Sequence, residues 1–192
     1  MHQSSHKFST IIRSLLVAVA LLTFSLPGNA ATKCAAASFV ISAGKTYDQA
    51  ARTGSASALA NGIDRYSDMR SISMFALGRY RGSLPKTREA EFVRLTKTFM
   101  GKFMQKNGKN FRVGTLSVVG CSGSSSDITV NARTAAGASV SFRLSKTGSG
   151  YSVRDMRANS IWLVQQIRST FVGTISRGNG DIDALFSYLK RY

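Results

Sequence analysis

The stretch DITVNARTAAGASVSFRLSKTGSGYSVRDMR, residues 127–157, decides the fold class that this sequence predicts. Apolar and polar residues alternate along it, most clearly around Val140 and Phe142, and a period of two is typical of strands with one buried face. Turn segments around Gly137 and Gly148 interrupt the alternation, so we expect antiparallel strands joined by tight turns. The expected strands are 127–135, 138–146 and 151–157.

Segments with other patterns flank these strands. We expect one further strand at 111–119, followed by a loose connection rich in glycine and serine at 120–126. Apolar residues spaced three or four apart predict helices on both sides. The expected helices are 35–51, 55–66, 68–81 and 83–106, and two more after Asn159. Ser83 is a candidate cap of the long helix, and Pro85 stands in its first turn. The sequence therefore predicts an α+β fold, a four-stranded, curved antiparallel sheet covered by about six helices.

The sheet and helices together form a slot lined by phenylalanine and branched aliphatic side chains. Protein interiors are normally packed to the density of organic crystals, so a solid core is the ordinary outcome. An apolar cavity that holds a ligand would give the same periodicity. The pattern leaves both alternatives open.

The N-terminus has the features of an export signal. An uncharged apolar run at 15–26 follows two basic residues and is too short to span a bilayer as a mature helix. Pro27 ends the run, and the small residues at 28–30 suit a signal peptidase. We expect residues 1–30 to be a cleaved signal peptide and 31–192 to be a single exported domain. A retained membrane anchor is the alternative.

Histidine occurs only in this leader, at His2 and His6. Its absence from residues 31–192 excludes Ser-His-Asp and Cys-His nucleophile pairs and histidine metal sites. Among the scattered acidic residues, Asp64 and Asp68 stand four apart beside arginines, and we interpret them as surface pairs. Phosphate-binding loops, dinucleotide fingerprints and nucleophile elbows do not occur. We therefore expect no catalysis, no metal and no cofactor.

Cys34 and Cys121 are the only cysteines. In an oxidising compartment a lone pair is normally a disulfide. The two residues lie 87 positions apart, and the loop-closure model assigns such a cross-link roughly 4–5 kcal/mol. We expect it to pin the N-terminal segment to the middle of the domain. A redox or nucleophilic thiol is the alternative, but neither cysteine has a CxxC partner.

Charge is the strongest compositional signal. The chain has 26 Lys and Arg against 9 Asp and Glu, a formal net charge of +17. Lys7 and Arg13 belong to the leader, which leaves +15 on residues 31–192. Such a charge favours a polyanionic partner. Because we expect export, an anionic membrane surface or an acidic partner is favoured over nucleic acid. Diffuse surface charge is the alternative, since the basic residues are spread along the chain.

Two segments resemble a known family. The first, residues 76–103, reads ALGRYRGSLPKTREAEFVRLTKTFMGKF and resembles the signature LG.YW...TP.QR.EF...F...L...Y of the MlaC, or toluene-tolerance, family of periplasmic phospholipid-binding proteins. The second, residues 151–189, reads YSVRDMRANSIWLVQQIRSTFVGTISRGNGDIDALFSYL and resembles the family signature V.D....GVSLV...R..F......GG.D.LI..L. The N-terminal region is also similar to the hopanoid-associated HpnM branch.

The resemblance implies a helix-covered antiparallel sheet, similar in shape to nuclear transport factor 2, that encloses phospholipid acyl chains in an apolar cavity. It implies a periplasmic carrier between an inner-membrane ABC transporter complex and an outer-membrane lipoprotein. Exposing one methylene to water costs about 0.8 kcal/mol. A lipid with two chains of about 15 methylenes each therefore meets a barrier of order 20 kcal/mol when it crosses water. A soluble carrier with a dry apolar lining removes that barrier.

Carried over position by position, the resemblance also implies residues that contact the lipid. They are Phe75, Tyr80, Phe99, Phe103, Val140, Phe142, Val153, Ile161, Val164, Ile167 and Phe171. Core packing is the alternative for each of them. Arg79 and Arg81 are candidates for the headgroup phosphate, because a guanidinium can donate two parallel hydrogen bonds to phosphate oxygens. A solvated basic face is the alternative for this pair.

The sequence departs from the family pattern at residues 160–162. Ser-Ile-Trp replaces Gly-Val-Ser there and places an indole near the expected cavity mouth. Two other functions stay open beside the lipid carrier. One is a structural or adaptor protein of the envelope with a basic surface and a solid core. The other is an enzyme that uses Asp155, the one acidic residue expected in mid-strand, as a buried base.

Overall fold

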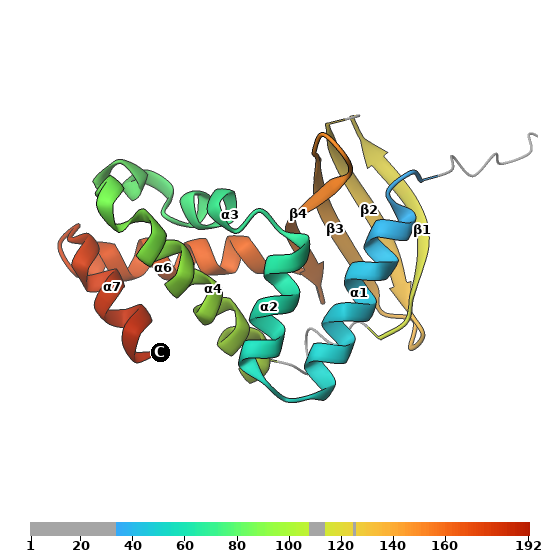
Figure 1. Ribbon diagram of the computed structural model, residues 1–192, viewed down its shortest axis with the longest axis horizontal. Coiled ribbons are helices and arrows are strands. Elements are labelled where there is room, and N and C mark those ends of the chain that lie inside the picture. Colours follow the sequence, from blue (N-terminus) through green and yellow to red (C-terminus); the bar gives the residue numbers. More distant parts are fainter. Residues whose placement is uncertain (1–33, 108–113, 125) are drawn as a thin grey trace, which may run out of the picture. The chain divides into compact units, whose positions relative to one another are not determined.

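The computed structural model describes residues 34–107, 114–124 and 126–192, drawn as a ribbon in Figure 1. The expected signal peptide lies outside the described residues. In chain order the elements are α1 (Ala37–Arg52), α2 (Ala56–Tyr66), α3 (Met69–Ala76), the 3-10 helices η1 (Gly78–Ser83) and η2 (Lys86–Arg88), α4 (Glu89–Lys106), β1 (Leu116–Gly123), β2 (Asp127–Thr134), β3 (Ser139–Lys146), β4 (Tyr151–Ala158), β5 (Ile161–Trp162), α6 (Leu163–Arg177) and α7 (Ile182–Arg191). Within these ranges, no helix is both long and apolar enough to cross a membrane.

The sheet has the strand order β1-β2-β3-β4-β5, and each strand pairs antiparallel with the next. This confirms the predicted α+β class and the antiparallel meander. The register of β2 with β3 pairs Val130 with Phe142 and Ala132 with Val140. Because side chains alternate between the two faces of a strand, these apolar residues share one face, which packs into the core.

The prediction of four strands misses β5, in which Trp162 pairs with Arg157. A two-residue turn joins β4 to β5, and its residues Asn159 and Ser160 have φ angles of 49° and 65°. Positive φ at both central residues is the geometry of a tight hairpin turn. Since β5 is only 2 residues long, it has no alternation that the sequence could reveal.

The first strand lies further along the chain than expected. The sequence predicts a strand at 111–119 and a loose connection at 120–126, whereas β1 includes the first part of that connection. The register shifts between Val118 and Gly120, and Val119 at this bulge is 60% exposed. Pairing with β2 holds the glycine- and serine-rich segment in the sheet, although its own side chains give no strand signal.

The segment between α3 and α4 differs from the end of the helix predicted at 68–81 and the start of the one predicted at 83–106. α3 ends at Ala76, and Gly78 takes a φ of +57°, a conformation that glycine adopts readily and that interrupts a helix. Ser83 is the last residue of η1, and Pro85 is extended with φ −62° and ψ 135°. The predicted cap at Ser83 and the place of Pro85 in the first turn are therefore wrong, and α4 begins at Glu89.

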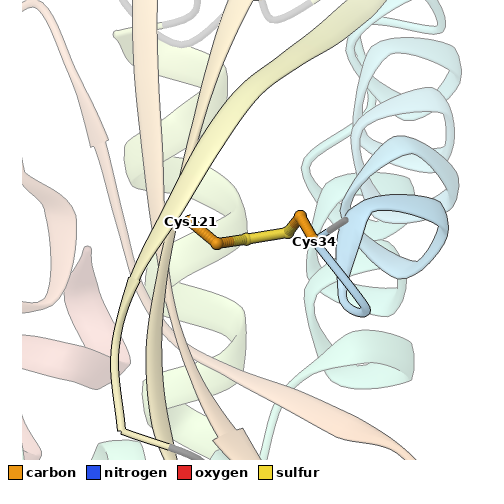
Figure 2. The surroundings of a disulfide bond; sticks show 2 residues. All are labelled: Cys34 and Cys121. Atoms are coloured by element: carbon orange, nitrogen blue, oxygen red, sulfur yellow. A yellow bond between two sulfur atoms is a disulfide. The ribbon is translucent and has the colours of Figure 1, made fainter. Parts of the chain in front are cut away.

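α1 lies against β1 and is tied to it covalently. Cys34, just before the helix, forms the predicted disulfide with Cys121 of β1, and the two Cα atoms lie 5.6 Å apart (Figure 2). Further along α1, the ring of Phe39 contacts that of Tyr151 at a centroid distance of 5.9 Å. The N-terminal part of the domain is thus fastened to the sheet, as expected.

α4, α6 and α7 lie side by side (Figure 1) and pack around a cluster of aromatic rings. Phe92, Phe99, Phe171 and Phe186 are all fully buried. The centroid of Phe99 lies 5.2 Å from that of Phe171, and the centroid of Phe92 lies 5.9 Å from that of Phe186. Edge-to-face and tilted contacts at such distances are favourable, so we describe these four residues as the aromatic cluster.

Candidate functional site

A pocket of about 300 Å³ lies between α3 and the junction of β4 with α6. Its lining residues are Asp68, Ser71, Ile72, Phe75, Arg143, Arg154, Asp155, Val164 and Gln165. Helices α3 and α6 supply the apolar wall, strands β3 and β4 supply Arg143, Arg154 and Asp155, and the cap residue of α3 supplies Asp68. The pocket therefore joins an apolar surface to a polar one, as ligand pockets commonly do.

An irregularity in β4 brings the charged groups to the pocket. Arg143 pairs with Asp155 and Leu144 pairs with Val153, so Arg154 has no partner in the register between β3 and β4. An extra residue of this kind is a bulge, which redirects side chains and increases the local twist. As a result both Arg154 and Asp155, although adjacent in the sequence, line the pocket.

Asp155 is only 5% exposed and caps α6 from the neighbouring strand. Its Oδ1 accepts hydrogen bonds from the backbone N–H groups of Val164 and Met156, both at 2.8 Å. Burial raises the pKa of Asp155, and the hydrogen bonds from Val164 and Met156 and the charge of Arg143 only partly offset this effect. A helix N-terminus favours a nearby carboxylate, so the structural role of Asp155 is evident from its contacts.

Asp68 is itself the N-cap residue of α3. Its carboxylate accepts hydrogen bonds from the backbone N–H of Ser71 at 3.0 Å and from the hydroxyl of Ser71 at 2.6 Å. These hydrogen bonds hold the pKa of Asp68 below its usual value. Both carboxylates of the pocket are thus engaged by helix N-termini.

The two arginines of the pocket are held differently. The Arg143 guanidinium lies 3.9 Å from the ring centroid of Trp162, a close cation–π contact. Arg154 forms an ion pair with Asp127 at 2.8 Å in which both side chains are about half exposed. Trp162 is the residue at which the sequence departs from the family pattern, and its indole lies at the charged wall.

A smaller cavity of about 20 Å³ adjoins the pocket, and Ile72, Arg154, Asp155 and Val164 line both. Its other lining residues are Tyr47, Ile63, Ser67, Met100, Met104, Val153, Met156 and Leu163. Methionine side chains are unbranched and adapt their shape to irregular spaces. The pocket therefore has an adaptable apolar floor between α2, α4 and β4.

Three of the eleven residues expected to contact lipid line these two cavities, namely Phe75, Val153 and Val164. Phe75 is 42% exposed, and the Arg168 guanidinium lies 4.7 Å from its ring centroid. Val153 and Val164 are buried. The structure thus brings these three residues to the cavity walls, and their contact with lipid stays a prediction.

The other eight residues do not line the two cavities. They are Tyr80, Phe99, Phe103, Val140, Phe142, Ile161, Ile167 and Phe171. Phe99 and Phe171 belong to the aromatic cluster, and Phe103 packs on Phe99 at a centroid distance of 6.0 Å. Val140, Phe142 and Ile167 are buried in the core, whereas Ile161 on β5 is 43% exposed.

The candidate headgroup residues Arg79 and Arg81 lie on η1 and do not line the pocket. Arg79 donates a hydrogen bond to the hydroxyl of Tyr80 at 3.0 Å. The arginines that do line it, Arg143 and Arg154, were not predicted. The sequence pointed to this part of the molecule only through the indole of Trp162. The alternation of apolar and polar residues in β4 does not reveal the bulge that brings Arg154 to the pocket.

The described residues contain no group of three or more His, Cys, Asp or Glu side chains that could hold a metal ion. Asp155, the residue considered as a catalytic base, accepts backbone hydrogen bonds that fix its carboxylate at the start of α6. This arrangement suits helix capping and the formation of the pocket wall.

A curved antiparallel sheet, a layer of amphipathic helices and an apolar pocket with a charged wall define an α+β protein of the ligand-binding class. The chain belongs to the MlaC protein family, whose family model matches residues 35–191. This confirms the resemblance seen in the sequence, while the assignment to the HpnM branch stays a prediction.

Among solved structures, the chain is similar to a phospholipid-binding protein from Ralstonia solanacearum in complex with a phospholipid. The TM-score is 0.68 at 18% sequence identity, and the match covers 81% of this chain and 95% of that chain. At this identity the likeness shows that the fold is shared. The curated proteins compared with the chain include no significant match.

Proposed function

We propose that this protein binds a phospholipid, with an acyl chain in the pocket between α3 and the β4–α6 junction, and carries it through the periplasm. Membership of the MlaC family and the likeness to a protein solved with a phospholipid support this function. The observation that carries the proposal for this place is the apolar wall of Ile72, Phe75 and Val164, which continues into the methionine-lined cavity.

Lipid binding at this site requires the pocket to widen. A volume of about 300 Å³ is at the lower end of the range of roughly 300–1,000 Å³ for ligand pockets. The adaptable floor of Met100, Met104 and Met156 can yield to an acyl chain. Phe75, Val153 and Val164 would contact the chain first, and the buried Val140, Phe142 and Ile167 would contact it only if the helices move away from the sheet.

The proposed partners follow from the family and the charge. A periplasmic carrier would receive lipid from one membrane system and deliver it to another, through an inner-membrane ABC transporter complex and an outer-membrane lipoprotein. The net charge of +15 on residues 31–192 favours contact with anionic membrane surfaces or acidic partners. A hopanoid cargo is the variant of this proposal that the HpnM resemblance favours.

A second candidate is an envelope adaptor with a solid core and no lipid cargo. The aromatic cluster favours it, because Phe99 and Phe171 fill the space between α4, α6 and α7 with ring contacts. These two residues, for which lipid contact stays a prediction, pack against each other in the structure. The adaptor and the carrier differ in one measurable property, the presence of bound lipid.

Mass spectrometry of organic extracts from the purified protein tests the proposal. We expect phospholipid to co-purify, and lipid-free protein to take up phospholipid from vesicles. Hopanoid in the extract would support the alternative cargo. A protein that contains no lipid and takes up none would support the adaptor.

Two matched variants test the location of the site. Gln165 lines the pocket and Gln166, its neighbour, does not, and both are exposed on α6. Gln165→Trp places an indole at the pocket and should reduce the lipid content several-fold, whereas Gln166→Trp should leave it unchanged. Equal lipid contents in the two variants would place the lipid elsewhere.

A further inference from the structure

We propose that Arg143 binds the phosphate group of the lipid and makes this pocket selective for phosphate-bearing lipids. The inference rests on the proposed lipid binding and adds a specificity-determining residue to it. The ligand chemistry is a phosphate diester whose oxygens accept hydrogen bonds from a guanidinium.

Arg143 is the cation of the pocket that no ion pair holds, although its charge interacts with that of Asp155, its register partner on β4. Among the described residues, no carboxylate lies within ion-pair distance of its guanidinium. The carboxylates that face it, Asp68 and Asp155, are engaged by the N-termini of α3 and α6. Arg154, the other cation, is held by Asp127 outside the pocket.

Trp162 prepares Arg143 for this role. The guanidinium lies 3.9 Å from the centre of the Trp162 ring, which restricts the side chain before any ligand binds. A stacked guanidinium still has its N–H donors directed outward in its own plane, where they can form two parallel hydrogen bonds to phosphate oxygens. Because rigid groups lose less entropy on binding, this arrangement favours affinity.

Arg154 can provide a second cation. Its ion pair with Asp127 is about half exposed on both sides, and such pairs contribute little to stability. A phosphate in the pocket can therefore compete with Asp127 for Arg154 at small cost. The apolar wall of Ile72, Phe75 and Val164 lies in the same pocket, so one lipid can place its acyl chain and its phosphate in adjacent parts of the site.

The test compares uptake of two lipids with identical acyl chains, phosphatidylglycerol and diacylglycerol, from mixed vesicles. The wild-type protein should prefer phosphatidylglycerol by roughly tenfold or more, as expected for a hydrogen bond to a charged group. Arg143→Gln should remove most of this preference, and Arg143→Lys should restore part of it. Diacylglycerol uptake by Arg143→Gln checks that this variant is folded and that its pocket is intact.

Arg157→Gln is the matched control. Arg157 contacts the same indole, with its guanidinium 5.1 Å from the Trp162 ring centroid, but it does not line the pocket. It should keep the wild-type preference. A preference that survives in Arg143→Gln, or is lost equally in Arg157→Gln, would overturn the inference.

Two further outcomes separate the inference from related ones. Uptake of diacylglycerol and phosphatidylglycerol with no preference would refute the phosphate site and leave lipid binding intact, whereas uptake of neither would refute both. Titration with inorganic phosphate, followed by calorimetry, should show no saturable binding at millimolar concentration. Tight binding of inorganic phosphate that depends on Arg143 would assign the site to free phosphate and overturn the lipid role.

Discussion

Oδ1 of Asp155 accepts a hydrogen bond from the backbone N–H of Val164 at 2.8 Å, so a residue of β4 caps the helix that follows nine positions later. Trp162 occupies the cap position of α6 itself and provides no side-chain hydrogen bond. The pocket wall depends on this contact, because both Asp155 and Val164 line the pocket.

Replacement of Asp155 should separate capping from charge. Asp155→Ala removes the acceptor and should lower the free energy of unfolding by about 1–3 kcal/mol, because buried N–H groups lose their partner. Asp155→Asn keeps an acceptor oxygen and should cost less. Urea denaturation measures both, and equal losses would contradict the capping role.

The pH dependence of the same pair of proteins follows from the raised pKa of Asp155. The folded state binds this proton more tightly than the unfolded state, so stability falls as the pH rises from the ordinary value of 3.8 through the raised folded pKa. Asn cannot titrate. The free energy of unfolding of the wild-type protein minus that of Asp155→Asn should therefore decrease across this pH window and be constant above it. An increase in this difference would show that the folded pKa of Asp155 is lowered.

The disulfide should be a main contributor to stability. Cys34 and Cys121 close a loop of 87 positions, and reduction should lower the free energy of unfolding by as much as about 4 kcal/mol. The double variant Cys34→Ser/Cys121→Ser should show the same loss and no response to reductant. Unchanged urea midpoints for the reduced wild-type protein would count against this role.

A close helix crossing should make Gly101 irreplaceable. A Cβ at this position of α4 would collide with the carbonyl oxygen of Ala56 and lie 2.9 Å from the Cβ of Ala60, both in α2. Gly101→Ala should therefore destabilise the protein by about 1–3 kcal/mol. The control is Gly82→Ala in η1, where nothing lies within 4 Å; thermal unfolding should show a small change there, and comparable losses at both sites would exclude the steric explanation.

The turn between β4 and β5 should be improved by glycine. Ser160 has a φ of 65°, a conformation that costs a residue with a Cβ more than it costs glycine. Ser160→Gly, which restores the glycine of the family pattern, should raise the free energy of unfolding by roughly 0.5–1 kcal/mol. Ser139→Gly, an exposed strand position, should lower it instead. Urea denaturation distinguishes these signs, and a loss of stability in Ser160→Gly would contradict the argument.

The regular part of the fold could be predicted from local pattern. β2, β3 and β4 lie where the alternation around Val140 and Phe142 places them, because one face of each strand is buried. The start of β1 and the whole of β5 could not be predicted, since their places depend on pairing with β2 and β4 rather than on their own side chains. The break after Ala76 required the positive φ of Gly78, which no helical spacing shows.

Only some of the residues that we expect to contact lipid line the cavities, for a related reason. Phe75, Val153 and Val164 line the cavities, while Phe99 and Phe171 have the same apolar character and fill the aromatic cluster. Residue type and spacing show which side chains point inward. They do not show whether the opposite wall is close enough to fill the space.

The sequence by itself determined the fold class, the antiparallel meander and the family, because each depends on periodicity or motif. It favoured a disulfide between its two cysteines, and the structure shows that bond. Only the tertiary structure decided that α3 and the β4–α6 junction leave a pocket, and that aromatic rings of α4, α6 and α7 contact one another. It also decided that a bulge in β4 brings Arg154 and Asp155 beside Arg143 and Trp162. The physical reason is that cavities and charge clusters arise from distances between elements, and those distances are set by the packing of the whole chain.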